Sequence, residues 1–156
     1  MYFVLVAVGI VTCSTVYAQS PLPISGGGTG ATIASSALAN LGLPIVSVKD
    51  FGVTGNGSTN DTAAISNAMN ACVSKTVPHN GCTLYFPAGI YMTTGLSISS
   101  FVNIKGDGWG ITVIRLMPNT SSDVLTVPVS AFNFSIYGLT LDGNSAHGGR
   151  GNCFST

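Results

Sequence analysis

The stretch V-K-D-F-G-V-T-G-N-G-S-T-N-D-T-A-A-I, from Val48 to Ile65, decides the fold because it joins a first strand to a helix. Apolar and polar residues alternate over residues 46–51, as expected of a strand with one buried face. The residues G-N-G-S at positions 55–58 tolerate positive φ and predict a turn. After this turn, the sequence predicts a helix within about Asn60 to Lys75.

The predicted helix carries one narrow apolar stripe, and its first turn has several candidate caps. The stripe falls at helical spacing on Ala64, Ile65, Ala68, Met69, Cys72 and Val73. Thr59, Asn60 or Asp61 can cap the first turn, and Asp61 is the preferred cap. A stack of parallel coils leaves its core open at the first coil, so we expect this helix to cover that end.

Short strands follow the helix to the end of the chain. The run T-L-Y-F stops at Pro87, which cannot donate to a ladder. Further runs begin at Val102 and Val124, and their spacing predicts a coil of about 20 to 25 residues. An immunoglobulin-like sandwich has similar strands but does not account for the early helix. The pattern therefore predicts an all-β solenoid with an N-terminal capping α-helix.

Three segments together carry a family resemblance. They are the opening stretch, G-C-T-L-Y-F-P-A-G-I-Y at residues 81–91 and V-N-I-K-G-D-G at residues 102–108. They resemble the N-terminal part of proteins of the pectate-lyase-like family, which includes rhamnogalacturonases, epimerases and phage tailspike depolymerases. The resemblance implies a right-handed parallel β-helix over residues 46–156, incomplete at its C-terminal end. It also implies a polysaccharide as the partner, and a homotrimer if the chain is tailspike-like.

The same resemblance implies a class of chemistry. Lyases of this family hold calcium through aspartates and use an arginine as base, whereas its hydrolases use closely set carboxylates as acid and base. Calcium is a candidate cofactor by this resemblance alone. The five acidic residues are dispersed, and no two lie two positions apart on one strand. We therefore assign no catalytic residue, expect the catalytic carboxylates beyond Thr156, and predict that this chain alone is inactive.

The weak site candidates lie near the end of the chain. Asp142, in L-T-L-D-G-N, follows a strand and is a candidate catalyst, although Asp-Gly-Asn is also ordinary turn sequence. His147 and Arg150, in H-G-G-R-G-N, are candidates for binding a sugar carboxylate, because arginine binds carboxylates bidentately. The alternative for this segment is a solvated connection between coils. Asp107, in K-G-D-G, is interpreted as a turn residue.

Two aromatic residues and two cysteines leave alternatives open. Trp109 and Tyr137 could stack on sugar rings, or Trp109 could instead cover the core. Cys72 and Cys82 either form a disulfide across a short loop or pack as two buried thiols. Cys153 is then left without a pairing partner.

Two segments, residues 1–18 and residues 19–45, precede the predicted solenoid. Residues 1–18 are predicted to be a signal peptide, with an apolar run at residues 2–11 and small residues at the cleavage position, but no basic residue precedes the run. The alternatives are a membrane anchor, for which the run is short, and accidental residues before a truncated gene. Residues 19–45 are predicted to be a flexible linker, and their G-G-T-G-A-T string resembles an element of phage tail fibres.

Composition excludes two partner classes. The chain has five basic and five acidic residues, with no basic cluster for nucleic acid and no polybasic membrane patch once the signal is cleaved. The sequence therefore predicts the N-terminal part of a polysaccharide-acting β-helix protein, secreted or carried on a virion tail. The alternative is a non-catalytic glycan-binding or adhesion module on the same solenoid.

Overall fold

The computed structural model describes most of the chain after the predicted linker. The described residues are 45–74 and 81–155, together with positions 28, 29, 31, 32, 37 and 41. The predicted signal peptide over residues 1–18 lies outside the described residues, as does nearly all of the predicted linker over residues 19–45.

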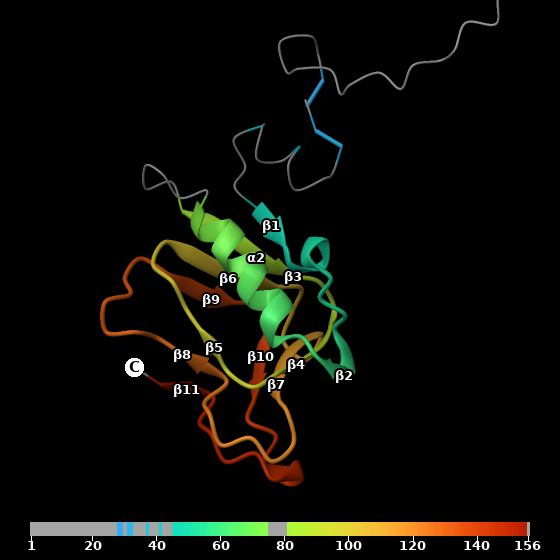
Figure 1. The fold of residues 1–156 in the computed structure, drawn as a ribbon, viewed down its shortest axis with the longest axis vertical. Helices are drawn as coiled ribbons and strands as arrows, with labels where there is room; N and C mark the ends of the chain where they lie inside the picture. Colours follow the sequence, from blue (N-terminus) through green and yellow to red (C-terminus); the bar gives the residue numbers. More distant parts are fainter. Residues whose placement is uncertain are drawn as a thin grey trace, which may run out of the picture.

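The described strands form three sheets, and every strand pair is parallel (Figure 1). The first sheet has the order β1-β3-β6-β9, with strands Ile45–Ser47, Cys82–Phe86, Val102–Gly106 and Ser135–Tyr137. The second has the order β2-β4-β7-β10, with strands Asn56–Asn60, Gly89–Thr93, Thr112–Leu116 and Thr140–Asp142. The third has the order β5-β8-β11, with strands Leu96–Ser97, Leu125–Thr126 and Phe154–Ser155. From β3 onward, the chain visits the three sheets in the same order three times.

The coil length varies more than the sequence predicts. Cys82 pairs with Val102, 20 residues further on, whereas Asn103 pairs with Ser135, 32 residues further on. The prediction that Val102 and Val124 begin matching strands of successive coils is wrong. Val102 begins β6 in the first sheet, whereas Val124 directly precedes β8, which belongs to the third sheet. Turns of unequal length between the sheets obscure the period.

The core consists of inward-facing side chains stacked from coil to coil. In the first sheet, Val46, Leu84 and Ile104 lie in one register row, and each is 1% exposed or less. Alternation along each strand places such rows inside, and each fully buried aliphatic or aromatic side chain stabilises the fold by roughly 1.5–3 kcal/mol. Phe86 and Tyr91 add an edge-to-face ring pair with centroids 5.2 Å apart.

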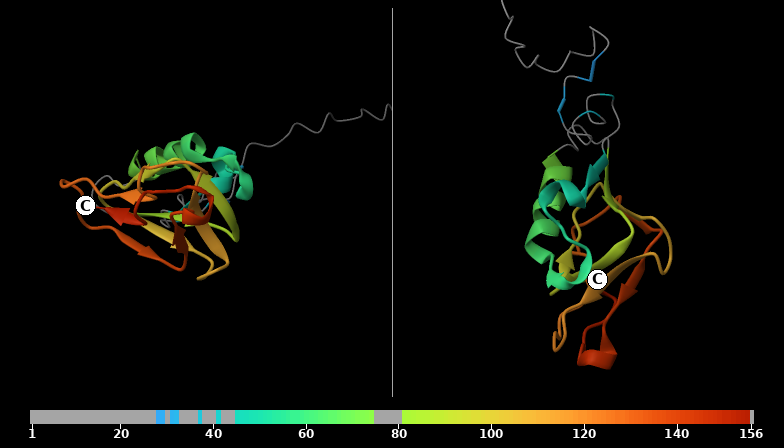
Figure 2. Two further views of the ribbon diagram at one scale, coloured as in Figure 1. Left: turned by 90° about the horizontal axis from the view of Figure 1, so that it is seen from below. Right: turned by 90° about the vertical axis from the view of Figure 1, so that its right-hand side faces the viewer.

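Helix α2, Thr62–Ser74, confirms the helix predicted within residues 60–75. It buries Ile65, Ala68, Met69 and Cys72, which belong to the predicted stripe. The helix packs on β1, β3 and β6 and lies along one outer side of the sheets (Figure 2). It thereby covers apolar side chains of the first strands.

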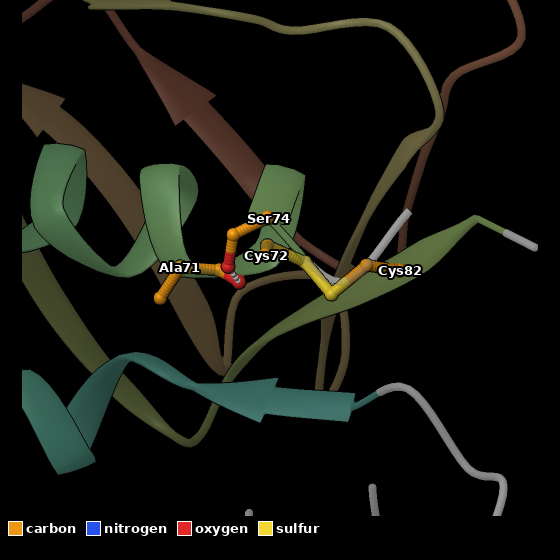
Figure 3. The surroundings of a disulfide bond; sticks show 4 residues. All are labelled: Ala71, Cys72, Ser74 and Cys82. Carbon is orange, nitrogen blue, oxygen red and sulfur yellow. Dashed lines mark hydrogen bonds between the residues drawn. A yellow bond between two sulfur atoms is a disulfide. The ribbon is translucent and has the colours of Figure 1, made fainter. Parts of the chain in front are cut away.

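Cys72 and Cys82 form a disulfide between the end of α2 and the first residue of β3 (Figure 3). Their Cα atoms are 5.5 Å apart, and both residues are buried. Of the two alternatives that the sequence left open, the structure has the disulfide. The bond ties the helix to the first sheet.

The opening stretch differs from its prediction in two places. The expected first strand ends at Ser47, and Val48–Phe51 form the 3-10 helix η2, which Gly52 ends with φ 79°. The expected turn at residues 55–58 instead enters β2, which pairs with β4. The hydrogen bond from Ile90 N to Gly55 O, 3.0 Å long, starts this pairing.

The end of β6 leaves no room for a side chain at Gly106. A Cβ atom there would overlap the carbonyl oxygen of Gly138 and lie 2.9 Å from the Cβ atoms of Leu139 and Thr112. We therefore expect Gly106→Ala to lower the free energy of unfolding by about 2 kcal/mol, as overpacking does. Urea unfolding followed by circular dichroism measures this loss.

Gly52→Ala is the comparison for that experiment. Its Cβ would meet nothing within 4 Å, so only the positive φ of 79° opposes the substitution. The expected loss is about 1 kcal/mol. A Gly106→Ala variant as stable as wild type, or more stable than Gly52→Ala, would contradict the close approach of successive coils.

Candidate functional site

The outward face of the second sheet carries a charged pair. Register aligns Met92 with Arg115, and Arg115 with Asp142, across the adjacent strands β4, β7 and β10. Their chain neighbours Tyr91, Ile114 and Leu116 point inward and are fully buried. Alternation along the strands therefore turns Arg115 and Asp142 outward, side by side.

Arg115 and Asp142 form an ion pair, with Nε 2.7 Å from Oδ2. Both side chains are about one-third exposed, at 34% and 35%. Partial burial raises the pKa of Asp142, but the hydrogen bond from Asn144 N and the hydrogen bond and charge of Arg115 outweigh it, so the pKa lies below its ordinary value. Asp142 is therefore a carboxylate at neutral pH and is unsuited to donate a proton as a general acid.

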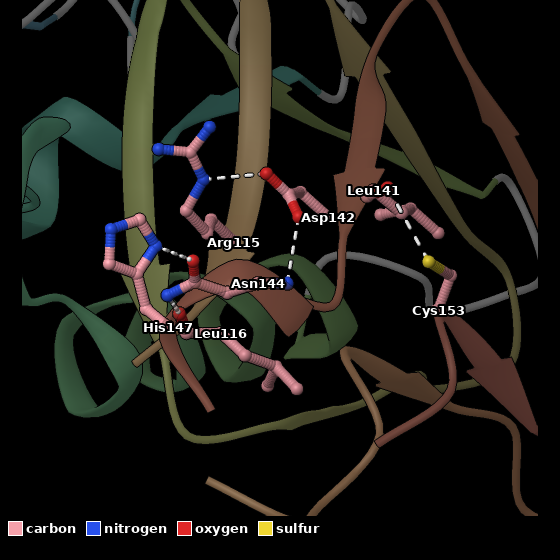
Figure 4. A network of polar contacts seen from close by, with 7 residues as sticks. All are labelled: Arg115, Leu116, Leu141, Asp142, Asn144, His147 and Cys153. Atoms are coloured by element: carbon pink, nitrogen blue, oxygen red, sulfur yellow. Dashed lines mark hydrogen bonds and ion pairs between the residues drawn. The ribbon is translucent and has the colours of Figure 1, made fainter. Parts of the chain in front are cut away.

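Asn144 builds the turn beside this pair (Figure 4). Its backbone has φ 55°, and its N–H donates to Asp142 Oδ1 at 2.7 Å. Its buried side chain donates to Leu116 O at 2.9 Å and lies 2.9 Å from His147 Nδ1 through its Oδ1 atom. The turn thus joins Asp142 and His147 into one polar network.

A hollow of about 200 Å³ opens over this network. It is lined by Gly57, Met92, Arg115, Pro118, Asn144 and His147. The terminal nitrogens of Arg115 point away from Asp142 (Figure 4), and within the described part of the chain they have no hydrogen-bond partner. An arginine held by one carboxylate through Nε keeps its outer edge free for a second carboxylate.

Arg150 does not join the other candidates. It is exposed and does not line the hollow, and its backbone N donates to Thr120 O at 2.9 Å. The segment around it packs closely on other backbone: a Cβ atom at Gly149 would overlap Gly143 O, and one at Gly151 would overlap Ser122 O on the preceding coil. The backbone of this segment is therefore packed at Gly149 and Gly151, whereas His147, Gly148, Arg150 and Asn152 are exposed, as a solvated connection between coils predicts.

Two other acidic residues have structural roles, and only that of Asp61 differs from its prediction. The carboxylate of Asp61 turns back to the loop before it and accepts from Thr54 N, Thr54 Oγ1 and Gly55 N at 2.8–3.0 Å, so it does not cap α2. Asp107 lies at a turn as predicted. Its carboxylate also accepts from Tyr85 Oη on β3 at 2.6 Å and from Ala88 N, in the turn after β3, at 2.8 Å.

Arg115 is the residue that the sequence analysis missed. One signal could have revealed it: V-I-R at residues 113–115 aligns with T-L-D at residues 140–142, which places Arg115 next to Asp142. Among the described residues, no three His, Cys, Asp or Glu side chains gather as a metal site, so no step is assigned to calcium. No helix in the described part is long and apolar enough to cross a membrane.

Comparisons with known proteins identify what the chain is similar to. A family model described as rhamnogalacturonase A/epimerase, pectate lyase-like matches residues 45–140. Mannuronan C5-epimerase AlgE2 of Azotobacter vinelandii is 42% identical over 110 residues, which cover 62% of this chain and 11% of that protein.

Two solved structures are also similar. The A-module of mannuronan C-5 epimerase AlgE4 of Azotobacter vinelandii has a TM-score of 0.58 and 29% identity, over 70% of this chain and 33% of that one. The ORF18 protein of Geobacillus virus E2 has a TM-score of 0.56 and 28% identity, over 67% of this chain and 22% of that one. The chain thus spans a third or less of the length of these relatives.

Proposed function

The chain belongs to the rhamnogalacturonase A/epimerase, pectate lyase-like family, and on this premise we propose that it forms the helix-capped end of a right-handed parallel β-helix that acts on an acidic polysaccharide. Three parallel sheets visited in a repeating order support the β-helix. The names of its epimerase relatives identify mannuronan, a uronic-acid polymer, as their substrate, which supports the polysaccharide. With this function, we propose that the protein is secreted.

The observation that carries the proposal is the free outer edge of Arg115. In the proposed complex, its terminal nitrogens bind the carboxylate of one uronate unit in the hollow. Asp142 is a positioning residue, because its carboxylate holds Arg115 through Nε. His147 lines the same hollow and is available to a sugar hydroxyl.

The same contact suits chemistry at C5 of a uronate. Removing the proton from this carbon places negative charge on the attached carboxylate, and a bound guanidinium stabilises that charge. Proton removal also needs a base that converges on the carbon, and Asp142 is already engaged by Arg115 and by Asn144 N. We therefore propose that this part of the protein binds the polymer and that catalysis draws on further coils.

Arg115→Gln tests the proposed contact. We expect it to weaken binding of polymannuronate to the chain about tenfold, the loss typical of one charge-assisted contact. Isothermal titration calorimetry at low ionic strength measures the affinity.

Arg150→Gln is the matched control, because it removes the same charge from an exposed arginine outside the hollow. We expect this variant to bind like wild type. The proposal fails if Arg115→Gln binds as tightly as wild type, or if Arg150→Gln loses as much affinity as Arg115→Gln.

The second candidate function is a non-catalytic glycan-binding module of a virion tail. The similarity to ORF18 of Geobacillus virus E2 favours it. This candidate places the protein on a virion, with a homotrimer as its proposed assembly. C5-epimerised units in polymannuronate, or unsaturated or reducing ends released from it, after treatment with a longer form of the protein would favour the enzyme. Tight binding that leaves the polymer chemically unchanged would favour the tail module.

A further inference from the structure

We propose a second polysaccharide site on the outward face of the first sheet, formed by Tyr85, Lys105, Tyr137 and Trp109. We call these four residues the aromatic–lysine row. Its ligand is a chain of uronic-acid sugars, whose ring faces stack on the aromatic side chains while a carboxylate pairs with Lys105. The choice of a polysaccharide rests on the proposed function, but the residues belong to a different sheet from Arg115.

Register aligns three of these residues across adjacent strands. Tyr85 on β3 pairs with Lys105 on β6, and Lys105 pairs with Tyr137 on β9. These strands lie side by side in Figure 1. Because neighbouring strands are about 4.8 Å apart, the two tyrosines lie roughly 10 Å apart with the lysine between them. A disaccharide unit running along the stack of coils spans that length.

The side chains of the row face solvent. Leu84, Phe86 and Ile104, their neighbours along β3 and β6, are fully buried, so alternation turns Tyr85 and Lys105 outward. Tyr137 is 49% exposed. Lys105 is exposed and forms no ion pair with any described residue, so its charge is free for a ligand.

Trp109 extends the row at the turn after β6. Its side chain is 85% exposed, which excludes the alternative that it covers the core. The flanking residues fix its backbone beside the end of β9: Gly108 N donates to Gly138 O at 2.8 Å, and Gly110 N donates to Thr140 Oγ1 at 2.9 Å. The tryptophan therefore lies close in the fold to Tyr137, which directly precedes Gly138.

The row is partly ordered before any ligand binds. Tyr85 donates its hydroxyl to Asp107 at 2.6 Å, and this bond raises the pKa of Tyr85. The other oxygen of Asp107 accepts from Ala88 N, so both carboxylate oxygens are engaged on the β3 side. Fixing an aromatic ring in advance lowers the entropy that binding must remove.

Polar side chains flank the row on the same face. Thr83, Asn103 and Ser135 form the adjacent register row, and Ser135 Oγ donates to Asn103 Oδ1 at 2.7 Å. Sugar hydroxyls can exchange hydrogen bonds with such groups, whereas sugar ring faces pack on aromatic rings.

This combination favours an acidic polysaccharide over other macromolecules. A nucleic acid would call for clustered basic residues, and the row has one. A protein interface would bury a broad apolar core, whereas this face mixes separate aromatic rings with hydroxyl and amide groups. Lys105, which has no ion-pair partner among the described residues, lies between aromatic rings and complements a sugar chain that carries carboxylates.

The experiment measures binding of polymannuronate to the full chain and to the variants Tyr137→Ala and Lys105→Gln. We expect each variant to bind about fivefold more weakly than wild type, because one exposed stacking or charge contact is lost. Dextran, a neutral polymer, is expected to bind far more weakly than polymannuronate. Val129→Ser is the control, because Val129 is fully exposed on the turn between β8 and β9, and the substitution is expected to leave the affinity unchanged.

The outcomes separate this site from the one around Arg115. Weaker binding in Tyr137→Ala and Lys105→Gln, with wild-type binding in Arg115→Gln, would retain the aromatic–lysine row and reject the second-sheet contact. Wild-type affinity in both row variants would overturn the row while leaving the second-sheet contact in place. Equal affinity for dextran and polymannuronate would overturn the assignment of an acidic ligand.

Discussion

Loss of the Cys72–Cys82 disulfide is expected to lower the free energy of unfolding by about 3 kcal/mol. The two cysteines are 10 residues apart in the chain, and closing a loop of that size removes about this much conformational freedom from the unfolded state. The bond also joins the covering helix to β3, which starts the first full coil. Urea unfolding of the double variant Cys72→Ser/Cys82→Ser measures the loss.

Cys153→Ser is the matched control for the disulfide prediction. Cys153 is an exposed free cysteine, so its substitution is expected to leave the midpoint of unfolding unchanged. Adding a reducing agent to the wild-type protein should reproduce the effect of the double variant. An unfolding midpoint that is the same with and without the reductant would show that the disulfide does not stabilise this fold.

Local sequence patterns predict where helices and strands lie better than they predict which strands pair. The apolar stripe of α2 is visible because helical spacing depends only on residues within the same segment. Strand β2 was instead predicted as a turn, since its N-G-S-T-N sequence has little strand propensity. Its pairing with β4 comes from tertiary contacts, such as the hydrogen bond of 2.8 Å from Asp61 N to Met92 O.

The same limit applies to the candidate site. Asp142 could be singled out because it follows a strand, but its partner Arg115 lies 27 residues earlier, on the preceding coil. Finding that pair requires the register between coils, which unequal turn lengths hide. Arg150 shares a Gly-rich segment with His147, yet the packed turn between them separates their side chains from a common site.

Register between coils also accounts for both proposed binding surfaces. In each outer face, residues one coil apart become neighbours: Arg115 with Asp142 in the second sheet, and Lys105 with Tyr137 in the first. A polymer lying along the stack would therefore meet one strand after another at a constant spacing. A parallel stack can in this way place repeating contacts along a repeating ligand.

The second large effect is expected at Asp61. This carboxylate is 2% exposed and accepts three hydrogen bonds from Thr54 and Gly55, which fix the loop between η2 and β2. Asp61→Ala would remove the buried carboxylate that accepts three hydrogen bonds, leaving two partly buried backbone N–H groups without their acceptor, so we expect it to lower the free energy of unfolding by roughly 3 kcal/mol. Thermal and urea unfolding measure the change.

Two further variants at aspartates decide whether the hydrogen bonds of Asp61 cause that loss. Asp61→Asn keeps the shape of the side chain but places an amide NH₂ opposite one of the donors, so it is expected to lose a large part of the same stability. Asp50→Asn removes one negative charge from an exposed position in η2 and is expected to change stability by less than about 0.5 kcal/mol. If Asp61→Asn were as stable as wild type, hydrogen bonds to the carboxylate would not be what holds this loop at the start of α2.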